Sequence, residues 1–423
     1  MQTELKKSIT WVQGTALTIG AVLGAGILVL PAIAAQLAGP ASLVSWIAMG
    51  LLSIPMVVAI GAMSSRYPDS GGLAAYVRRA FGDRAGEMTG LLILSAMPFG
   101  MPLTALVGAH YLGTVFAWGS GAIHLAATAL ILTAILLNYR GIELSGKSQV
   151  LVVSVILFIL FFVIIAATPT VNSKNFTPFA PSGWLPVGET MMLLFFAFIG
   201  WEMVGHLAEE FRNPKVDLPL SLGISLVIVA TIYVAISFVM VGNGLYRDTT
   251  ASGAMLGLIS RSLGDNAATA VALLGFLICY CPVHTFIAGF SRLVYAQART
   301  GEFPSRFAQL HPSFQTPHRA LLSFIPIFCG ILGLSYLFQW DLNTLIGFPS
   351  AVFLLVYTAG MFAAFQILST RFGRSCAFVS ALASLILFLF AGIYILYPLI
   401  VVFLVWLRQK RKMHRKHLIN YLS

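Results

Sequence analysis

One pattern runs through the chain from end to end: apolar stretches of roughly 20 residues alternate with short polar connections. A stretch of about that length crosses the hydrocarbon core of a bilayer as a helix. We count about twelve such stretches, at approximately 11–37, 42–64, 87–115, 120–138, 148–168, 188–210, 218–241, 266–295, 319–338, 343–366, 375–391 and 392–407. Each polar connection is shorter than a domain with its own core. The pattern predicts an all-α integral membrane protein.

Composition agrees with that prediction. Hydrophobic residues make up 58% of the 423 residues, charged residues only 9%, and the mean hydropathy is +0.90, values that exclude a soluble domain of this length. The four cysteines lie in or beside apolar stretches, which favours reduced packing residues over disulfides or a metal site; they are Cys279, Cys281, Cys329 and Cys376. We expect neither a metal nor a cofactor.

The basic residues predict how the chain is oriented. With an even number of spans, 22 of the 25 Lys and Arg fall in the tail and the loops of one side, and only Lys174, Arg247 and Arg261 fall on the other. By the positive-inside rule, both termini are cytoplasmic. The first apolar run is too long for a cleavable signal peptide and is expected to stay as a span. We expect the basic tail to touch anionic lipid rather than nucleic acid.

Glycines interrupt two of the predicted spans. Gly20, Gly24 and Gly26 lie in the first span, and Gly200 lies in the sixth. Glycine destabilises a helix interior by about 1 kcal/mol relative to alanine, and backbone groups freed in lipid need polar partners or a water-lined cavity. Gly20 and Gly24 alone also fit close helix packing. Interruptions at corresponding places in two halves indicate the substrate site of an inverted-repeat secondary transporter.

The positions of the two interruptions predict the domain plan. Residues 1–168 would form a first five-helix repeat and residues 169–366 a second, inverted one. Residues 367–407 would add two helices, and residues 408–423 the basic tail. An odd number of spans in each repeat gives the inverted relation that many secondary transporters share.

The interruptions also predict what is bound. The amides of Ala25, Gly26 and Ile27 would begin a half-helix, and a helix N-terminus suits a carboxylate. Freed carbonyls near Phe196 and Ile199 suit an ammonium group, so the pair would hold the two ends of an amino acid. Apart from Glu202, the middle of each span lacks acidic and basic residues, which favours an uncharged cargo. Residues that either line the side-chain pocket or simply pack are Ser95, Met97, Phe99, Met101, Phe196, Phe276 and Tyr280.

Glu202 and His206 are the candidates for proton coupling. A carboxylate at membrane depth is a functional candidate because it is costly unless paired or protonated. Glu202 has an equally good structural interpretation, in which it accepts hydrogen bonds from backbone groups that the interruption frees. His206, one helical turn further on, is either protonatable or merely packed. Glu209 and Glu210 are expected to meet basic loop residues.

One motif is misleading. Residues 141–148, Gly-Ile-Glu-Leu-Ser-Gly-Lys-Ser, satisfy the phosphate-loop pattern G-x-x-x-x-G-K-[ST]. A phosphate loop needs a strand before it and a helix after it, whereas this octet joins two apolar spans. We therefore do not expect ATP or GTP to bind here.

Four stretches of the chain resemble the amino acid-polyamine-organocation superfamily, in its amino-acid efflux branch. They are Ile19-Gly20-Ala21-Val22-Leu23-Gly24-Ala25-Gly26-Ile27; Tyr67-Pro68-Asp69-Ser70-Gly71-Gly72 with Phe81-Gly82; Phe196 to Glu202 and on through Glu210 and Asn213-Pro214-Lys215 to Pro219; and Arg292 to Pro304. The resemblance implies a five-plus-five inverted repeat of about 12 helices, with helices one and six broken and two helices added.

The resemblance also implies a substrate site. The carboxylate would meet the amides of Ala25 and Gly26, and the ammonium the carbonyls of Val22, Phe196 and Ile199, under the Phe196 ring as a gate. Gly24, Gly200 and Tyr280 complete the expected site. Several proton-coupled relatives carry a lysine in the fifth span, where alignment on Gly141, Ser145, Gly146 and Gln149 places Ile156. Coupling through a lysine is therefore not expected, and Glu202 or His206 takes its place.

These expectations define a secondary active transporter of small neutral amino acids and not an enzyme. The efflux branch implies export of L-methionine, leucine, isoleucine and valine across a bacterial inner membrane. We expect transport by alternating access, with proton antiport through Glu202 or His206 as the candidate form of coupling. The direction rests on that resemblance alone. An uptake permease or exchanger of the same fold is the alternative, followed by a nutrient sensor that does not transport. The sequence carries no signal from which an oligomeric state could be predicted.

Overall fold

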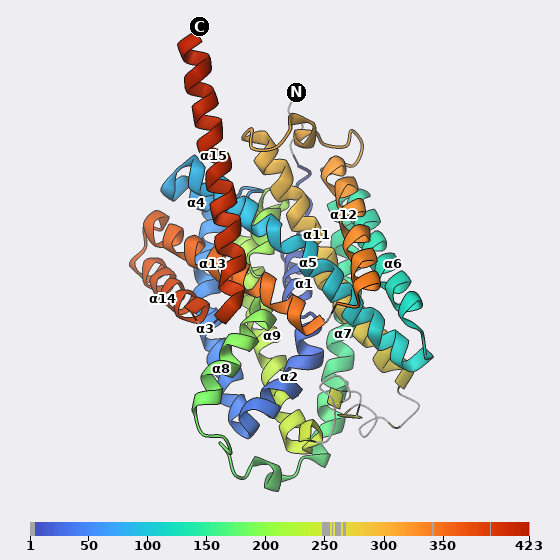
Figure 1. The fold of residues 1–423 in the computed structure, drawn as a ribbon. Helices are drawn as coiled ribbons and strands as arrows, with labels where there is room; N and C mark the ends of the chain where they lie inside the picture. The colour runs from blue at the N-terminus through green and yellow to red at the C-terminus, as the bar shows by residue number, and fades with distance from the viewer. Residues whose placement is uncertain are drawn as a thin grey trace.

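The computed structural model describes residues 5–422, apart from 248–253, 256, 259–263, 265–267, 341 and 390. In this part of the chain the regular elements are helices (Figure 1). One isolated parallel bridge pairs Ile9 with Phe211. Within the described ranges, eleven stretches are long and apolar enough to cross a membrane. The predicted all-α membrane class is confirmed.

The helices follow the predicted spans closely, and the difference between eleven and twelve has a local cause. Helix α2 (Ala25–Ala38) and helix α3 (Ser42–Arg66) are separated only by the 3-10 turn η1 (Gly39–Ala41), so they form one continuous stretch, Ala25–Arg66. Helix α1 (Trp11–Val22) is only a half-span of 12 residues. The twelve-helix inverted repeat, with boundaries at 168, 366 and 407, stays a prediction.

The other long helices are α5 (Asp83–Phe116), α6 (Ser120–Tyr139), α7 (Ile142–Ala167), α9 (Pro214–Asn243), α11 (Ala268–Arg299), α12 (His318–Phe338), α13 (Leu342–Ile367), α14 (Arg371–Leu389) and α15 (Leu396–Leu422). Shorter elements are α4 (Leu73–Phe81), α8 (Leu185–Leu194), and the 3-10 segments η4 (Phe195–Phe198), η5 (Met203–Glu210) and η8 (Ser305–Ala308).

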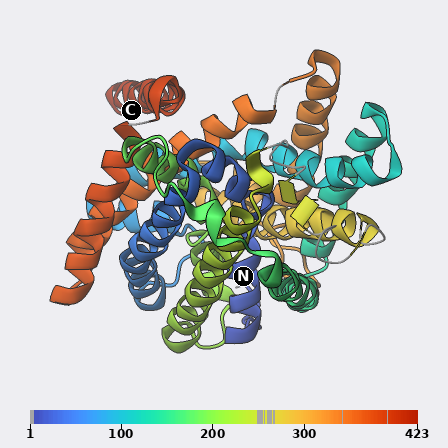
Figure 2. The same cartoon turned by 90° about the horizontal axis from the view of Figure 1, so that it is seen from below.

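Burial separates central from peripheral helices. Each span has one most apolar window of 18 residues. The buried share of that window is 83% in α11 and 78% in the stretch from α8 to η5, but only 17% in the span that contains the first part of α15. Helix α1 packs against α7, α9 and α11, and α11 packs against α5. From below, α14 and α15 lie towards one edge of the molecule and α6 and α12 towards another (Figure 2). The interrupted spans are thus placed where protein, rather than lipid, can partner their free backbone groups.

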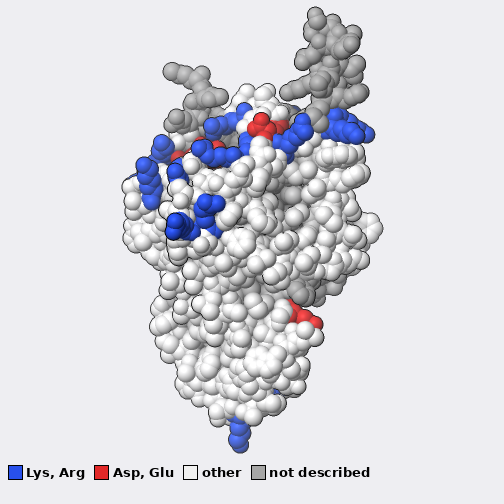
Figure 3. All heavy atoms as spheres, turned by 90° about the vertical axis from the view of Figure 1, so that its left-hand side faces the viewer, with Lys and Arg blue, Asp and Glu red and all other residues white. Residues whose placement is uncertain are grey.

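Both termini lie at the same end of the molecule in Figure 1. Most of the Lys and Arg side chains visible in Figure 3 gather at that end, while the middle of this face is uncharged. We call it the terminal end; the positive-inside rule predicts that it faces the cytoplasm.

The phosphate-loop octet has the wrong setting for nucleotide binding. Helix α6 ends at Tyr139 and α7 begins at Ile142, so residues 141–148 form a connection and the first turns of a helix. A phosphate loop follows a strand, which α6 is not. The four cysteines are free; Cys279, Cys281 and Cys376 are buried, and Cys329 is half-buried.

Candidate functional site

The first span is interrupted at the predicted place. Helix α1 ends at Val22 and α2 begins at Ala25, with Gly24 in an extended conformation between them. Ala25 and Gly26 are the first residues of α2, and the first amides of a helix lack a carbonyl four residues back. The next amide, of Ile27, donates to the carbonyl of Gly24 at 3.2 Å. Two backbone donors therefore stand at the start of a half-helix, the arrangement that favours an anion.

The sixth span is interrupted over a longer segment than glycine alone indicates. Helix α8 ends at Leu194, and η4 and η5 continue the chain in 3-10 turns around Gly200. Gly200 has φ of +131°, a conformation that side chains rarely adopt. A Cβ built on Gly200 would lie 2.9 Å from the carbonyl carbon of Ala21. The two interruptions are therefore in direct contact, and Gly200 permits that contact.

Tyr233 of α9 joins the two interruptions. Its hydroxyl lies 2.9 Å from the carbonyl oxygen of Val22 and 3.0 Å from that of Ala197. The ring stacks on Trp46 of α3, with centroids 4.8 Å apart. The Val22 carbonyl also accepts from the Gly24 amide at 3.0 Å. A substrate ammonium at Val22 would therefore have to replace one of these two donors, because a carbonyl oxygen has two lone pairs.

A cavity lies beside the two interruptions, and its walls are almost entirely apolar. Three helices contribute residues spaced four apart, which share one helical face: Ala96, Gly100 and Thr104 of α5, Pro282, Phe286 and Phe290 of α11, and Pro349 and Phe353 of α13. Met101 adds a thioether, and the Thr104 hydroxyl donates to the Gly100 carbonyl at 2.8 Å. None of the described lining residues carries a charge.

Six of the eight predicted substrate residues line this cavity: Val22, Gly24, Ala25, Gly26, Phe196 and Ile199. Gly200 shapes the interruption from outside it, and Tyr280 turns its hydroxyl to His284, at 3.0 Å. Of the predicted side-chain pocket, Met101 and Phe196 line the cavity, whereas Ser95, Met97, Phe99 and Phe276 are not among its lining residues.

The glycines of the first span have different neighbours. A Cβ on Gly20 would lie 1.8 Å from Nε2 of Gln149, and one on Gly24 would lie 3.1 Å from Pro282. These two glycines allow close packing of α7 and α11 against the first span. A Cβ on Gly26 would lie 3.0 Å from the Cβ of Ala197, so Gly26 allows the two interruptions to approach each other.

Glu202 is buried and accepts hydrogen bonds through one carboxylate oxygen. Oε2 accepts from the Gly200 amide at 3.0 Å and from the hydroxyl of Tyr357 of α13. Oε1 is buried without a partner among the described residues. Glu202 therefore makes the contact that the structural interpretation predicts, because it accepts a hydrogen bond from the Gly200 amide, which the interruption frees. The unpartnered oxygen leaves a position where a proton would add without displacing a donor.

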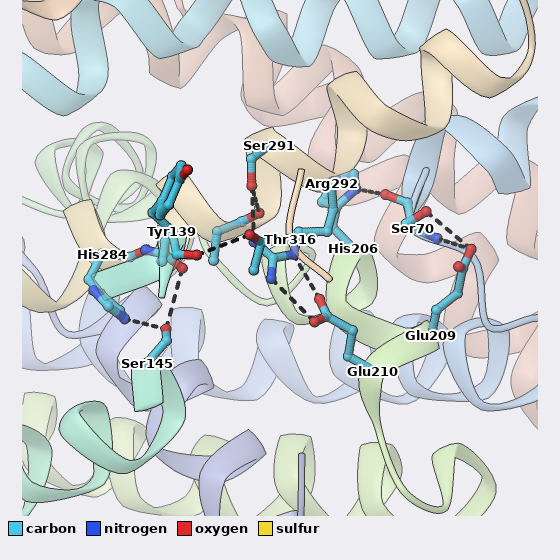
Figure 4. A network of polar contacts seen from close by, with 12 residues as sticks. Ser70, Tyr139, Ser145, His206, Glu209, Glu210, His284, Ser291, Arg292 and Thr316 are labelled. Atoms are coloured by element: carbon cyan, nitrogen blue, oxygen red, sulfur yellow. Dashed lines mark hydrogen bonds and ion pairs between the residues drawn. The ribbon is translucent and has the colours of Figure 1, made fainter. Parts of the chain in front are cut away.

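His206 packs against the loop that follows the second span. Its Nδ1 lies 3.1 Å from the Ser70 carbonyl, while Nε2 is buried without a partner among the described residues. The same loop binds Glu209, whose Oε1 accepts from the Ser70 amide at 2.9 Å and hydroxyl at 3.1 Å (Figure 4). In this loop, burial raises the pKa of the Asp69 carboxyl, although the Gly71 amide donates to it at 2.7 Å.

Glu209 and Glu210 meet basic residues, as predicted, but these residues belong to helix α11 and not to a loop. Arg292 forms a buried two-point pair with Glu210 at 2.7 and 3.2 Å, and Arg299 contacts Glu209 at 3.3 Å. The amides of Ser8 and Ile9 both donate to the Glu210 carbonyl at 2.9 Å. The N-terminal segment, η5, the 69–72 loop and α11 are thus bonded together. Figure 4 shows the contacts among Ser70, Glu209, Glu210 and Arg292.

A second polar cluster ties α11 to the start of α7. Nε2 of His284 lies 2.6 Å from the Ser145 hydroxyl, which lies 3.3 Å from Oδ1 of Asn138 in α6. One assignment of protons satisfies all three contacts: the Tyr280 hydroxyl donates to Nδ1 of His284, Nε2–H of His284 donates to the Ser145 hydroxyl, and that hydroxyl donates to Oδ1 of Asn138. Tyr280, predicted in the substrate site, therefore belongs to this cluster, whose contact between His284 and Ser145 is drawn in Figure 4.

Two broken spans in contact, an uncharged cavity beside them and multiple membrane helices define a membrane transport protein. Residues 9–422 match the model of the amino acid permease family, and the chain belongs to that family, part of the superfamily that the motifs resemble. It is a multi-pass membrane protein of an amino acid transport family. The family and the similar proteins are transporters and not enzymes.

Three relatives show the range of the similarity. The chain is 41% identical to the amino acid permease YecA of Bacillus subtilis, itself described as uncharacterized, over 94% of each chain. It is 28% identical to the L-methionine/branched-chain amino acid exporter YjeH of Escherichia coli, over 95% of this chain and 96% of YjeH. It is also 28% identical to the branched-chain amino acid permease BcaP of Bacillus subtilis, over 75% of this chain and 72% of BcaP.

From its efflux-branch motifs, the chain is expected to be most similar to YjeH. YjeH is similar over nearly the whole chain, yet YecA is more similar. The comparisons place the chain among amino acid permeases and leave its substrate and direction to be proposed.

Proposed function

We propose that the protein is a secondary active transporter of small neutral amino acids. The supporting observation is the cavity, where the free amides of Ala25 and Gly26 stand beside walls of phenylalanine, proline and methionine without a charged side chain. A zwitterion would place its carboxylate on the amides and its ammonium on the carbonyls of Val22, Phe196 and Ile199. A cationic or anionic cargo would lack a counter-charge there.

We further propose that the cargo is L-methionine and the branched-chain amino acids, and that the direction is export across a bacterial inner membrane with both termini cytoplasmic. The names of YjeH and BcaP support the substrate class, and only YjeH supports the direction. Alternating access would move the cargo, and protons exchanged at Glu202 or His206 would drive it. The basic tail would rest on anionic lipid.

The test is flux of labelled methionine, leucine and arginine in reconstituted vesicles, with and without a pH gradient. Methionine and leucine are expected to move and arginine to stay. Movement of methionine in the direction of import, instead of export, would favour the permease alternative. Binding of methionine without flux would favour a sensor. Flux of arginine equal to that of leucine would contradict the neutral cavity.

A further inference from the structure

A groove opens on the outside of the bundle, and none of its lining residues lines the cavity of the proposed substrate site. Its lining comes from the end of α4, the end of α13 and the first turn of α14: Phe81, Ala359, Phe362, Phe365, Gln366 and Arg374. The groove has a volume of about 540 Å³. Phe81 is 51% exposed and Phe362 is 40% exposed, so aromatic surface faces outward in a concave site.

Positive charge stands at one rim of this groove. The Arg374 guanidinium lies over the Phe365 ring, 4.8 Å from its centroid. Arg371 lies three residues earlier in α14, and Arg66 donates to the Ser369 hydroxyl at 2.6 Å in the preceding connection. Among the residues that the structure describes, no acidic side chain pairs with Arg66, Arg371 or Arg374.

The position of the groove matches the level of a lipid headgroup. Helix α13 ends at Ile367 and α14 begins at Arg371, so the arginines lie where two membrane helices meet the polar region. Phe365 and Phe362 of α13 precede that end by two and five residues, so they lie deeper than the arginines. A guanidinium binds a phosphate through two parallel hydrogen bonds, and an aromatic groove accommodates an acyl chain.

We propose that this groove is a binding site for an anionic phospholipid. The phosphate would bind Arg374, with Arg371 and Arg66 adding positive potential, and one acyl chain would follow Phe365, Phe362 and Phe81. The uncompensated positive charge selects an anionic headgroup over a zwitterionic one. The site is separate from the basic tail, and it is independent of which amino acid is transported.

The experiment is lipid titration of the purified full-length protein in neutral detergent, with bound lipid counted by native mass spectrometry. Phosphatidylglycerol is expected to bind more tightly than phosphatidylcholine of the same chains. Each basic residue near an anionic surface contributes about 1 kcal/mol, so Arg374→Gln should weaken phosphatidylglycerol binding about fivefold. Ala359→Phe should fill the groove and weaken both lipids. Arg140→Gln, an exposed arginine on the α6–α7 connection, is the matched control and should change nothing.

Four results would overturn the proposal. One is equal retention of the two lipids by the unmodified protein, and another is wild-type phosphatidylglycerol binding in both Arg374→Gln and Ala359→Phe. The third is loss of binding only when Lys410, Arg411, Lys412, Arg415 and Lys416 are replaced by Gln, which would locate the lipid at the tail. Inorganic phosphate is expected not to displace the lipid, because it lacks the acyl chain; displacement at equal concentration would also contradict the site.

Discussion

Tyr233 is one side chain that contacts both interruptions. Its hydroxyl has a single proton, so it can donate to the Val22 carbonyl or to the Ala197 carbonyl but not to both at once. Any motion that separates the first and sixth spans must break at least one of these contacts. Tyr233 is therefore a positioning residue for the proposed substrate site.

Replacing Tyr233 by Phe keeps the ring on Trp46 and removes the shared hydrogen bond. We expect a stability loss of about 0.5–1.5 kcal/mol, the usual net contribution of one hydrogen bond, and a larger relative loss of methionine flux. Melting temperature in detergent and vesicle flux measure the two effects. Tyr336→Phe, at a residue 44% exposed, is the control. Flux in Tyr233→Phe equal to wild type would contradict the positioning role.

Glu202→Gln separates the structural and coupling interpretations of this carboxylate. Glutamine retains an acceptor oxygen for the Gly200 amide and the Tyr357 hydroxyl but cannot exchange a proton. If Glu202 carries the coupled proton, exchange of labelled for unlabelled methionine should persist while stimulation by a pH gradient disappears. Tyr357→Phe removes one donor without removing the carboxylate and should keep the gradient dependence. A gradient effect of wild-type size in Glu202→Gln would leave Glu202 with its structural role alone.

These residues differ in how far the sequence reveals them. Gly24, Gly26 and Gly200 could be identified because glycine within an apolar helix is a local anomaly. Tyr233 could not, because its role depends on two carbonyls brought together only by the fold. Phe286 and Phe353 were hidden among many phenylalanines, although their spacing of four from Pro282 and Pro349 was a usable signal.

The two interrupted helices act as one unit because they touch at glycines. Glycine at 26 and at 200 lets the interruptions approach to distances that a Cβ would prevent. The sequence located both interruptions but predicted a simple helix break at Gly200. The 3-10 turns of η4 and η5 around it reflect contacts with α1, α11 and α13, which no local pattern encodes.

Alanine substitutions test that contact. Gly200→Ala must adopt a positive φ and meet the Ala21 backbone, and strain of this kind costs about 1–3 kcal/mol. We expect a lower melting temperature and at least tenfold less flux. Gly26→Ala should have a smaller effect, because φ at Gly26 is not positive and its Cβ would lie 3.0 Å from the Cβ and 3.2 Å from the Cα of Ala197. Gly188→Ala in the same span adds a Cβ with nothing within 4 Å and should behave as wild type. Equal behaviour of Gly200→Ala and Gly188→Ala would contradict the contact.

At the scale of the whole molecule, one hydrogen-bonded layer follows the cavity along α11: Pro282, Phe286 and Phe290 line the cavity, and Arg292 and Arg299 bond the layer. Its members come from segments far apart in sequence: residues 8–9, the 69–72 loop, η5 and α11. The charge pattern predicted that acidic and basic residues would meet, but not that one pair would be buried. If this layer closes the terminal end, the proposed alternating access requires it to open. Of its contacts, the buried pair of Glu210 and Arg292 costs most when one partner is removed.

Removing either member of that pair should therefore favour opening at the terminal end. A buried charge without its partner costs about 3–5 kcal/mol, and the cost is relieved when the layer opens and water reaches the charge. In Glu210→Gln and in Arg292→Gln, we expect the amides of Ser8 and Ile9, now bonded to the Glu210 carbonyl, to exchange hydrogen at least tenfold faster than in wild type. Hydrogen–deuterium exchange of the N-terminal peptide measures this.

Asp83→Asn is the matched control, since it breaks a pair with Arg78 at 3.7 Å whose carboxylate is 95% exposed, and exposed pairs contribute about 0–1 kcal/mol. Its N-terminal exchange should stay at the wild-type rate. If both variants of the buried pair also kept wild-type protection, the layer would not depend on Glu210 and Arg292, and the closure would have to rest on the Ser70 and Glu209 contacts instead.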